Sequence, residues 1–220
     1  MSQPITAGDV RPAFTPQTAY IHPRITGDKI RYFEWMGAAV YTADQRAGAM
    51  HGKQFLLDAA FAGINRSFVF GRVDFAETVP EMEFDVVVNL ESWANDEARA
   101  RHTLRLDGHV QDRQLTEWKV DGMAESSPSA STGDEDSAKA ALQRSFEFRL
   151  PLSWLLATRG PGPSDEPTRP GGSGVTPAAP ASRLRLRFSL WQNRLPVDAL
   201  PVDGWIELRL VSEEELGGGM

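Results

Sequence analysis

The sequence contains no cysteine. Disulfides, zinc–thiolate sites, iron–sulfur clusters and cysteine nucleophiles are therefore excluded, and we expect a cytoplasmic location. The sequence also lacks any window of about 18 uncharged apolar residues, the length that a membrane helix needs. Met1 is followed by Ser, Gln and Pro rather than by the basic and apolar run of an export signal. We therefore expect neither a membrane span nor a membrane partner.

Basic residues are fewer than acidic ones, 23 against 30, which gives the 220-residue chain a formal net charge of -7. A surface that binds phosphate backbones needs a basic patch, so nucleic acid is not an expected partner. Hydrophobic residues make up 41% of the chain and charged residues 24%, as in ordinary globular domains. The composition therefore indicates a folded domain that does not act on nucleic acid.

Two stretches are too poor in large apolar side chains to join a core, residues 124–142 and residues 159–182. The second has five Gly and six Pro, a composition that forms neither long strands nor long helices. We expect both to be surface loops, since lengthening a loop costs little free energy. The predicted organisation is an extended lead-in over residues 1–20, one domain over 21–212, and a tail over 213–220.

Short runs of aromatic and β-branched residues, separated by turn residues, predict an all-β fold. In Arg183–Gln192, leucine and phenylalanine alternate with arginine, so one face of the strand is expected to be buried and the other wet. Antiparallel sheets packed in pairs produce this pattern, which predicts a two-sheet antiparallel β-sandwich with two loop inserts. The predicted strands are Arg31–Trp35, Gly37–Thr42, Lys53–Ala62, Ser67–Phe75, Glu81–Glu91, Ala100–His109, Gln114–Val120, Gln143–Pro151, Arg183–Gln192 and Trp205–Val211. Short helices are predicted over Ser92–Arg101 and Pro151–Ala157.

No recognised catalytic motif is present. The sequence has no nucleophile elbow, phosphate-binding glycine loop, His-Glu-x-x-His pair or Asp-rich calcium loop. The four histidines have no metal-ligand spacing, and His102 and His109 fall on opposite faces of a regular strand. Carboxylates that alternate along strands are expected mainly on solvent faces. We therefore expect neither a metal site nor a cofactor.

The densest aromatic and polar patch runs from Tyr32 to His51. Aromatic rings stack on sugar rings, and Asp, Arg and His offer hydrogen bonds to hydroxyl groups. Packing in the core is the competing interpretation, because alternate residues of a strand face inward. We take six residues as candidates for carbohydrate binding or a domain interface: Tyr32, Trp35, Tyr41, Asp44, Arg46 and His51.

Two other interpretations of the same patch remain open. His51 with Asp44 or Glu34 would be an acid–base pair suited to neutral pH, as in a small free-standing carbohydrate-active enzyme. Alternatively Trp35, Tyr41 and Met50 would form an apolar patch that docks on another domain, in an interaction module without sugar affinity.

Three segments stand out: Ile21–Gly27, Tyr32–Ala39 (YFEWMGAA) and Gly48–His51 (GAMH). Together they resemble the opening of the C-terminal β-domain of bacterial family 57 glycoside hydrolases, the α-amylase and 4-α-glucanotransferase group that acts on α-glucans. Weaker similarity extends to Phe68–Asp74, which ends in Arg-x-Asp, to Leu195–Asp198 and to Gly204–Leu208.

The resemblance implies an accessory domain without the catalytic barrel. In that family the nucleophile and the acid/base lie in a large N-terminal barrel, to which nothing in this chain corresponds, so no catalytic residue carries over. The chain is expected to be non-catalytic by itself, either as a truncated product or as a separately encoded piece. The implied partners are a family 57 type catalytic barrel, in the parent chain or as a separate subunit, and an α-glucan.

Overall fold

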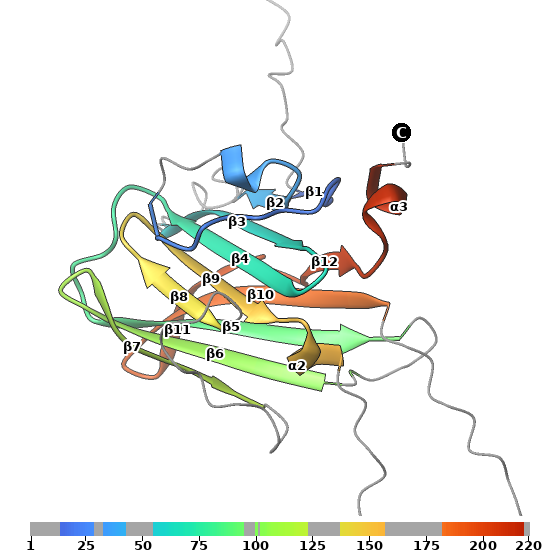
Figure 1. The fold of residues 1–220 in the computed structure, drawn as a ribbon. Coiled ribbons are helices and arrows are strands. Elements are labelled where there is room, and N and C mark those ends of the chain that lie inside the picture. Colours follow the sequence, from blue (N-terminus) through green and yellow to red (C-terminus); the bar gives the residue numbers. More distant parts are fainter. Residues whose placement is uncertain are drawn as a thin grey trace, which may run out of the picture.

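The computed structural model describes residues 14–28, 33–42, 55–94, 100, 102–122, 137–156 and 182–217. Two antiparallel sheets pack face to face (Figure 1), which confirms the predicted all-β two-sheet sandwich. Sheet A contains, in spatial order, β1 (Phe14–Thr15), β2 (Ala39–Thr42), β3 (Leu57–Ile64), β4 (Phe68–Phe75), β9 (Ser145–Pro151) and β8 (Lys139–Leu142). Sheet B contains β11 (Leu195–Leu200), β10 (Arg183–Gln192), β5 (Phe84–Trp93), β6 (His102–Gln111) and β7 (Gln114–Asp121), and β12 (Ile206–Arg209) also pairs with β10.

The main core lies between the two sheets and follows the alternation in the sequence. In β10 the apolar side chains are buried while the arginines between them are only partly covered. Strands β5 and β6 alternate largely in the same sense and contribute mainly Val and Leu, whereas β9 adds Phe146, Phe148 and Leu150 but also buries Ser145 and Glu147 on its other face. The rings of Phe148 in sheet A and Phe188 in sheet B meet with their centroids 6.1 Å apart. Burial of these apolar faces is the main source of stability of the sandwich.

Two hairpins of sheet B close through tight two-residue turns. Residues Asp112 and Arg113, between β6 and β7, have φ values of 52° and 60°. Asn193 and Arg194, between β10 and β11, have φ values of 50° and 65°. Positive φ at both turn positions matches the right-handed twist of the flanking strands, as in type I′ turns. The second turn adds β11, a strand that the sequence analysis did not predict.

Three predicted elements differ in the structure. The expected strand Arg31–Trp35 is wrong over residues 33–35, which form a 3₁₀ turn, while residues 31 and 32 lie outside the described residues. The expected helix Ser92–Arg101 is wrong at its start, because Ser92 and Trp93 extend β5 and pair with β10. The expected loop 124–142 ends early, since residues 139–142 form β8; residues 124–136 and 159–181 lie outside the described residues.

Of the two predicted short helical regions, only Pro151–Ala157 contains a helix among the described residues. Helix α2 (Ser153–Leu156) lies within the predicted helix Pro151–Ala157 and places Trp154 and Leu155 at the end of the core. A second short helix, α3 (Glu213–Gly217), occupies the predicted tail. Strand β1 lies in the predicted lead-in and pairs with β2. The structure is therefore more regular near both ends of the described chain than the sequence suggested.

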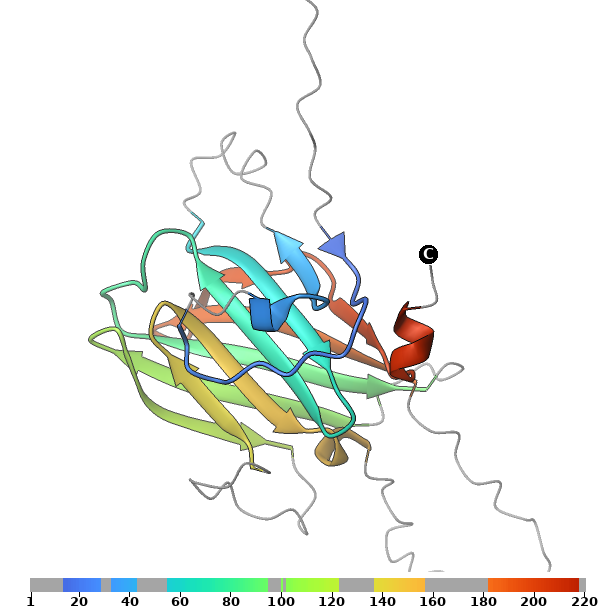
Figure 2. The ribbon, with the colours of Figure 1, turned by 45° about the horizontal axis from the view of Figure 1, so that its top comes forward.

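A third layer covers the outer face of sheet A. Residues 16–28, which we call the strap, run from the end of β3 to the turn between β8 and β9, and Figure 2 shows this segment in blue crossing the sheet. The strap and the following turn bury a second apolar cluster made of Ile21, Ile25, Trp35, Ala38, Ala59, Phe61 and Phe70. Strands β3 and β4 are consequently buried on both faces, unlike β10.

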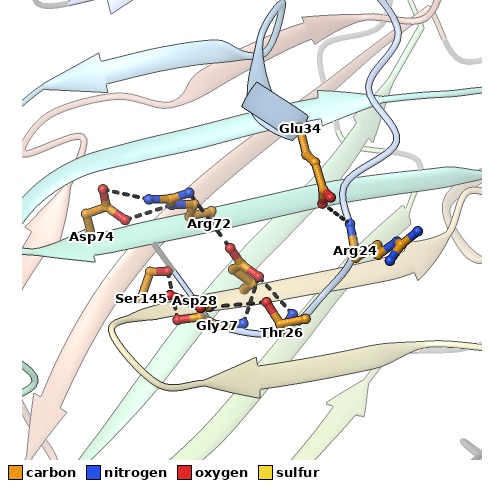
Figure 3. A network of polar contacts seen from close by, with 9 residues as sticks. Arg24, Thr26, Gly27, Asp28, Glu34, Arg72, Asp74 and Ser145 are labelled. Atoms are coloured by element: carbon orange, nitrogen blue, oxygen red, sulfur yellow. Dashed lines mark hydrogen bonds and ion pairs between the residues drawn. The ribbon is translucent and has the colours of Figure 1, made fainter. Parts of the chain in front are cut away.

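A buried ionic network lies beneath the strap (Figure 3). The fully buried Arg72 donates from Nε to Asp74 Oδ1 at 2.7 Å and from Nη2 to Asp74 Oδ2 at 3.1 Å. Its Nη1 lies 3.8 Å from Glu147 Oε1. The rings of Phe61 and Trp35 lie 5.1 and 6.0 Å from the guanidinium carbon. A charge removed from water is tolerated only when paired in this way.

The carboxylate of Glu147 also holds the strap in place. Glu147 Oε2 accepts hydrogen bonds from the backbone N–H groups of Thr26 at 3.0 Å and Gly27 at 2.8 Å. The Gly27 carbonyl in turn accepts from the N–H groups of Arg144 and Ser145 at 2.9 and 3.0 Å. The strap is therefore joined to β9 by polar contacts at both the N–H and the C=O side of Gly27.

Replacement of Gly27 tests this close approach. Gly27 has a φ of 74°, and a Cβ there would lie 2.6 Å from the backbone nitrogen of Gln143. We expect Gly27→Ala to lower the free energy of unfolding by more than about 2 kcal/mol. The cost of a left-handed backbone conformation for alanine adds to the cost of the overlap between its Cβ and the Gln143 backbone. Gly204→Ala is the matched control, since Gly204 has a φ of 79° but no atom within 4 Å of the new Cβ. Urea unfolding of both variants measures the difference; equal losses would contradict the proposed contact.

The pH dependence of stability tests the burial of Glu147. Burial raises the pKa of Glu147 from its usual 4.5, against the opposing effect of the Thr26 and Gly27 N–H groups and of Arg72. The folded protein therefore takes up this proton at a higher pH than the unfolded chain does, and the contribution of Glu147 to stability falls as pH rises between the two pKa values. Relative to Glu147→Gln, the wild-type free energy of unfolding should fall across that window and level off above it, in urea titrations at several pH values. A difference that does not change with pH would contradict this assignment.

Candidate functional site

Trp35 is the best-described member of the patch predicted from the sequence. Its side chain is 3% exposed, lies in the second apolar cluster and meets the Phe61 ring at a centroid distance of 6.3 Å. The structure thus places Trp35 in the packing role that the sequence left open. Tyr41 lies in β2, half-buried, and packs against the main core.

The other members of the patch are not brought together by the described part of the chain. Tyr32, Asp44, Arg46 and His51, together with Met50, lie outside the described residues. Glu34, a possible partner of His51, accepts a hydrogen bond from the Arg24 backbone N–H at 2.7 Å and so helps to hold the strap (Figure 3). Sugar contact and acid–base chemistry at this patch stay predictions.

The turn that contains Trp35 also carries two exposed apolar side chains. Phe33 is 80% exposed and Met36 is 63% exposed, on either side of the inward-facing Glu34 and Trp35. Single exposed apolar residues are common, but two within one turn form a small apolar projection. We call Phe33 and Met36 the apolar turn.

A group of polar and aromatic side chains lies on the outer face of sheet B. Strand pairing places Glu117 of β7 opposite His109 of β6, His109 opposite Asp85 of β5, and Asp85 opposite Trp191 of β10. The four residues form one row across four strands, on the face opposite to the main core. Next to this row, Arg105 and Asp107 of β6 form a salt bridge, with Arg105 Nη2 at 2.8 Å from Asp107 Oδ1.

His109 and Asp85 form the centre of this row. His109 Nδ1 lies 2.7 Å from Asp85 Oδ1, and Nε2 lies 3.5 Å from Glu83 Oε1. The hydrogen bond to Asp85 raises the pKa of His109, partial burial acts in the opposite direction, and the charges of Asp85, Glu83 and Glu117 raise it further. The carboxylates therefore favour a protonated imidazole, which donates from both nitrogens.

Two depressions flank the His109–Asp85 pair, which lines both of them. The smaller, of about 150 Å³, is also lined by Glu83, Trp191 and Asn193. The larger, of about 390 Å³, extends over Glu117, Trp118, Lys119 and the Arg105–Asp107 salt bridge. Both are open to solvent, so together they form a shallow groove across sheet B. We call this feature the sheet B groove.

The described residues form neither a metal site nor a membrane-spanning helix. In that part of the chain no three His, Asp or Glu side chains are placed so that they could hold a metal ion. Within the same residues, no helix has the length and apolar character of a membrane span. The side chains of the groove offer hydrogen bonds and a stacking surface, which are the means of binding a polar, uncharged ligand.

Titration of His109 tests the arrangement of the groove. The midpoint of its imidazole should lie above the usual 6.5, and Asp85→Asn should lower it, because the Asp85 hydrogen bond is the largest cause of the raised pKa. Asp107→Asn is the matched control, since Asp107 lies on the same face but bonds to Arg105. NMR spectra of the imidazole C–H groups across pH 5–9 measure the midpoints. Equal effects of the two substitutions would show that the His109–Asp85 hydrogen bond is absent in solution.

No family model, no curated protein and no solved structure matches this chain.

Proposed function

We propose that this chain is a non-catalytic accessory domain of a family 57 type protein, which packs on the catalytic barrel, binds α-glucan, or does both. One observation carries the proposal: segments that resemble the family and lie far apart in the sequence meet in one structural unit. The strap supplies Gly27, the following turn supplies Trp35, and β4 supplies Arg72 and Asp74. A cytoplasmic location belongs to the same proposal.

The closing motif is used in a similar way. Asp198 of the Leu195–Asp198 segment is buried, and its Oδ2 accepts hydrogen bonds from the backbone N–H groups of Leu56 at 2.8 Å and Leu57 at 3.0 Å. This carboxylate joins β11 of sheet B to the start of β3 in sheet A. Motif residues with such roles specify the architecture of a domain rather than a reaction. They therefore support kinship of the domain and carry no catalytic role.

The apolar turn is the surface that best suits contact with the catalytic barrel. Trp35 packs the turn against sheet A and Glu34 joins it to the strap, so Phe33 and Met36 project from a fixed backbone. An apolar pair held rigidly loses little conformational entropy when it is covered. The alternative function is that of an interaction module that docks on another domain without binding sugar. The apolar turn would be the docking surface in that case as well.

Binding to a family 57 type catalytic barrel, produced without its own terminal β-domain, tests the proposal. We expect a complex by isothermal titration calorimetry, and we expect Phe33→Ser with Met36→Ser to weaken it by at least about tenfold. Leu195→Ser is the matched control, because Leu195 is 66% exposed but lies on β11, away from this turn.

Two results would contradict the proposal. The first is a failure of the wild-type chain to bind the barrel, or equal binding by the double variant. The second is turnover of starch or maltooligosaccharide by the purified chain alone, which would make it an enzyme. Binding of the barrel without any affinity for maltooligosaccharide would favour the alternative of a pure interaction module.

A further inference from the structure

We propose that the sheet B groove is a binding site for a neutral oligosaccharide, with Trp191 as its stacking surface and the His109–Asp85 pair as its hydrogen-bonding centre. This inference rests on the proposed function for the identity of the sugar, an α-glucan. It places the sugar on sheet B, whereas Trp35 and Tyr41, the two described residues of the predicted patch, belong to the turn over sheet A and to β2 of that sheet.

Trp191 provides a ring that is held in place. Its Nε1–H donates to Ser189 Oγ at 2.9 Å, two residues back on the same face of β10. The ring is only partly buried and lines the smaller depression. A sugar ring stacks on an aromatic face through its C–H groups, and a ring already fixed in orientation loses little entropy on binding.

The polar side chains around Trp191 suit hydroxyl groups. Asp85 and Glu83 accept hydrogen bonds, protonated His109 donates them, and the amide of Asn193 does both. Neighbouring hydroxyls of a sugar require donors and acceptors placed side by side, and the His109–Asp85 pair provides one of each. The Arg105–Asp107 salt bridge offers a second donor and acceptor pair in the larger depression.

The charge of the groove selects against acidic ligands. Glu83, Asp85 and Glu117 all surround His109, and their charges act on it. Phosphate or uronate groups would meet these carboxylates without a matching excess of positive charge. An uncharged chain avoids this repulsion, and the two depressions on either side of His109 give room for more than one sugar unit.

Titration of the full chain with maltoheptaose tests the site. We expect saturable binding by calorimetry, weakened by at least about tenfold in Trp191→Ala and in Asp85→Asn, with partial retention in Trp191→Phe. Trp93→Ala is the matched control. Trp93 lies on the same face and donates to Glu91 in the same way, at 3.0 Å, but Arg185 and Arg183 stack on it at 4.5 and 5.8 Å. Its loss should leave the affinity unchanged within about twofold.

Several outcomes would overturn the assignment. Loss of binding in Tyr41→Ala but not in Trp191→Ala would move the sugar to the patch predicted from the sequence. Equal losses in Trp191→Ala and Trp93→Ala would indicate a general effect on the sheet, and unchanged affinity in Asp85→Asn would remove the role of the pair. Absence of maltoheptaose binding by the wild type refutes the site. The accessory role fails instead if the barrel is not bound, if the Phe33→Ser, Met36→Ser variant binds it equally, or if the chain alone turns over starch, so the two failures are distinguishable.

Discussion

The buried charge of Arg72 is the interaction on which the outer layer of the molecule depends. A guanidinium with no exposure to solvent has to be compensated by protein groups, and Asp74 and Glu147 supply the two carboxylates. Glu147 then has one oxygen left for the backbone of the strap. Removal of one partner from such a group leaves a buried charge uncompensated, which costs about 3–5 kcal/mol. Arg72 and Glu147 therefore connect sheet A with the strap and with the Trp35 ring of the following turn.

The sequence was sufficient to predict the sandwich because its clearest strands bury one face only. In Arg183–Gln192 the period of two separates leucine from arginine, and the structure follows it. Leu57–Ile64 gives no such pattern, because the strap covers the second face of β3 and both sets of side chains are apolar or small. The strap itself has no periodicity, since its backbone forms few regular pairs and is held by side chains of distant strands. Coverage from a segment of this kind is a tertiary effect, which local patterns do not contain.

The candidate sites differ in how far the sequence could predict them. Arg72 and Asp74 are two residues apart on one strand, so their shared face follows from β-periodicity alone. His109 and Asp85 are separated by 24 residues and meet only through the register of β5 and β6. In the sequence His109 stands out only by its spacing from His102, and no local signal links it to Trp191. By contrast, Trp35 was a candidate because aromatic residues are dense around it in the sequence, and its side chain packs in the second apolar cluster.

The strap also fixes an order of events when the protein is made. Glu147 of β9, which accepts from the Gly27 N–H, lies 120 residues after Gly27. Val211, whose carbonyl accepts from the Tyr20 hydroxyl, lies 191 residues after Tyr20. Because translation proceeds from the N-terminus, the strap leaves the ribosome long before either partner exists. Contacts of such long range also carry the largest loop-closure cost and form slowly. The strap can therefore pack Ile21 and Ile25 on β3 and β4 before β9 exists, whereas its polar contacts with Glu147 and Val211 form only after those residues have been made.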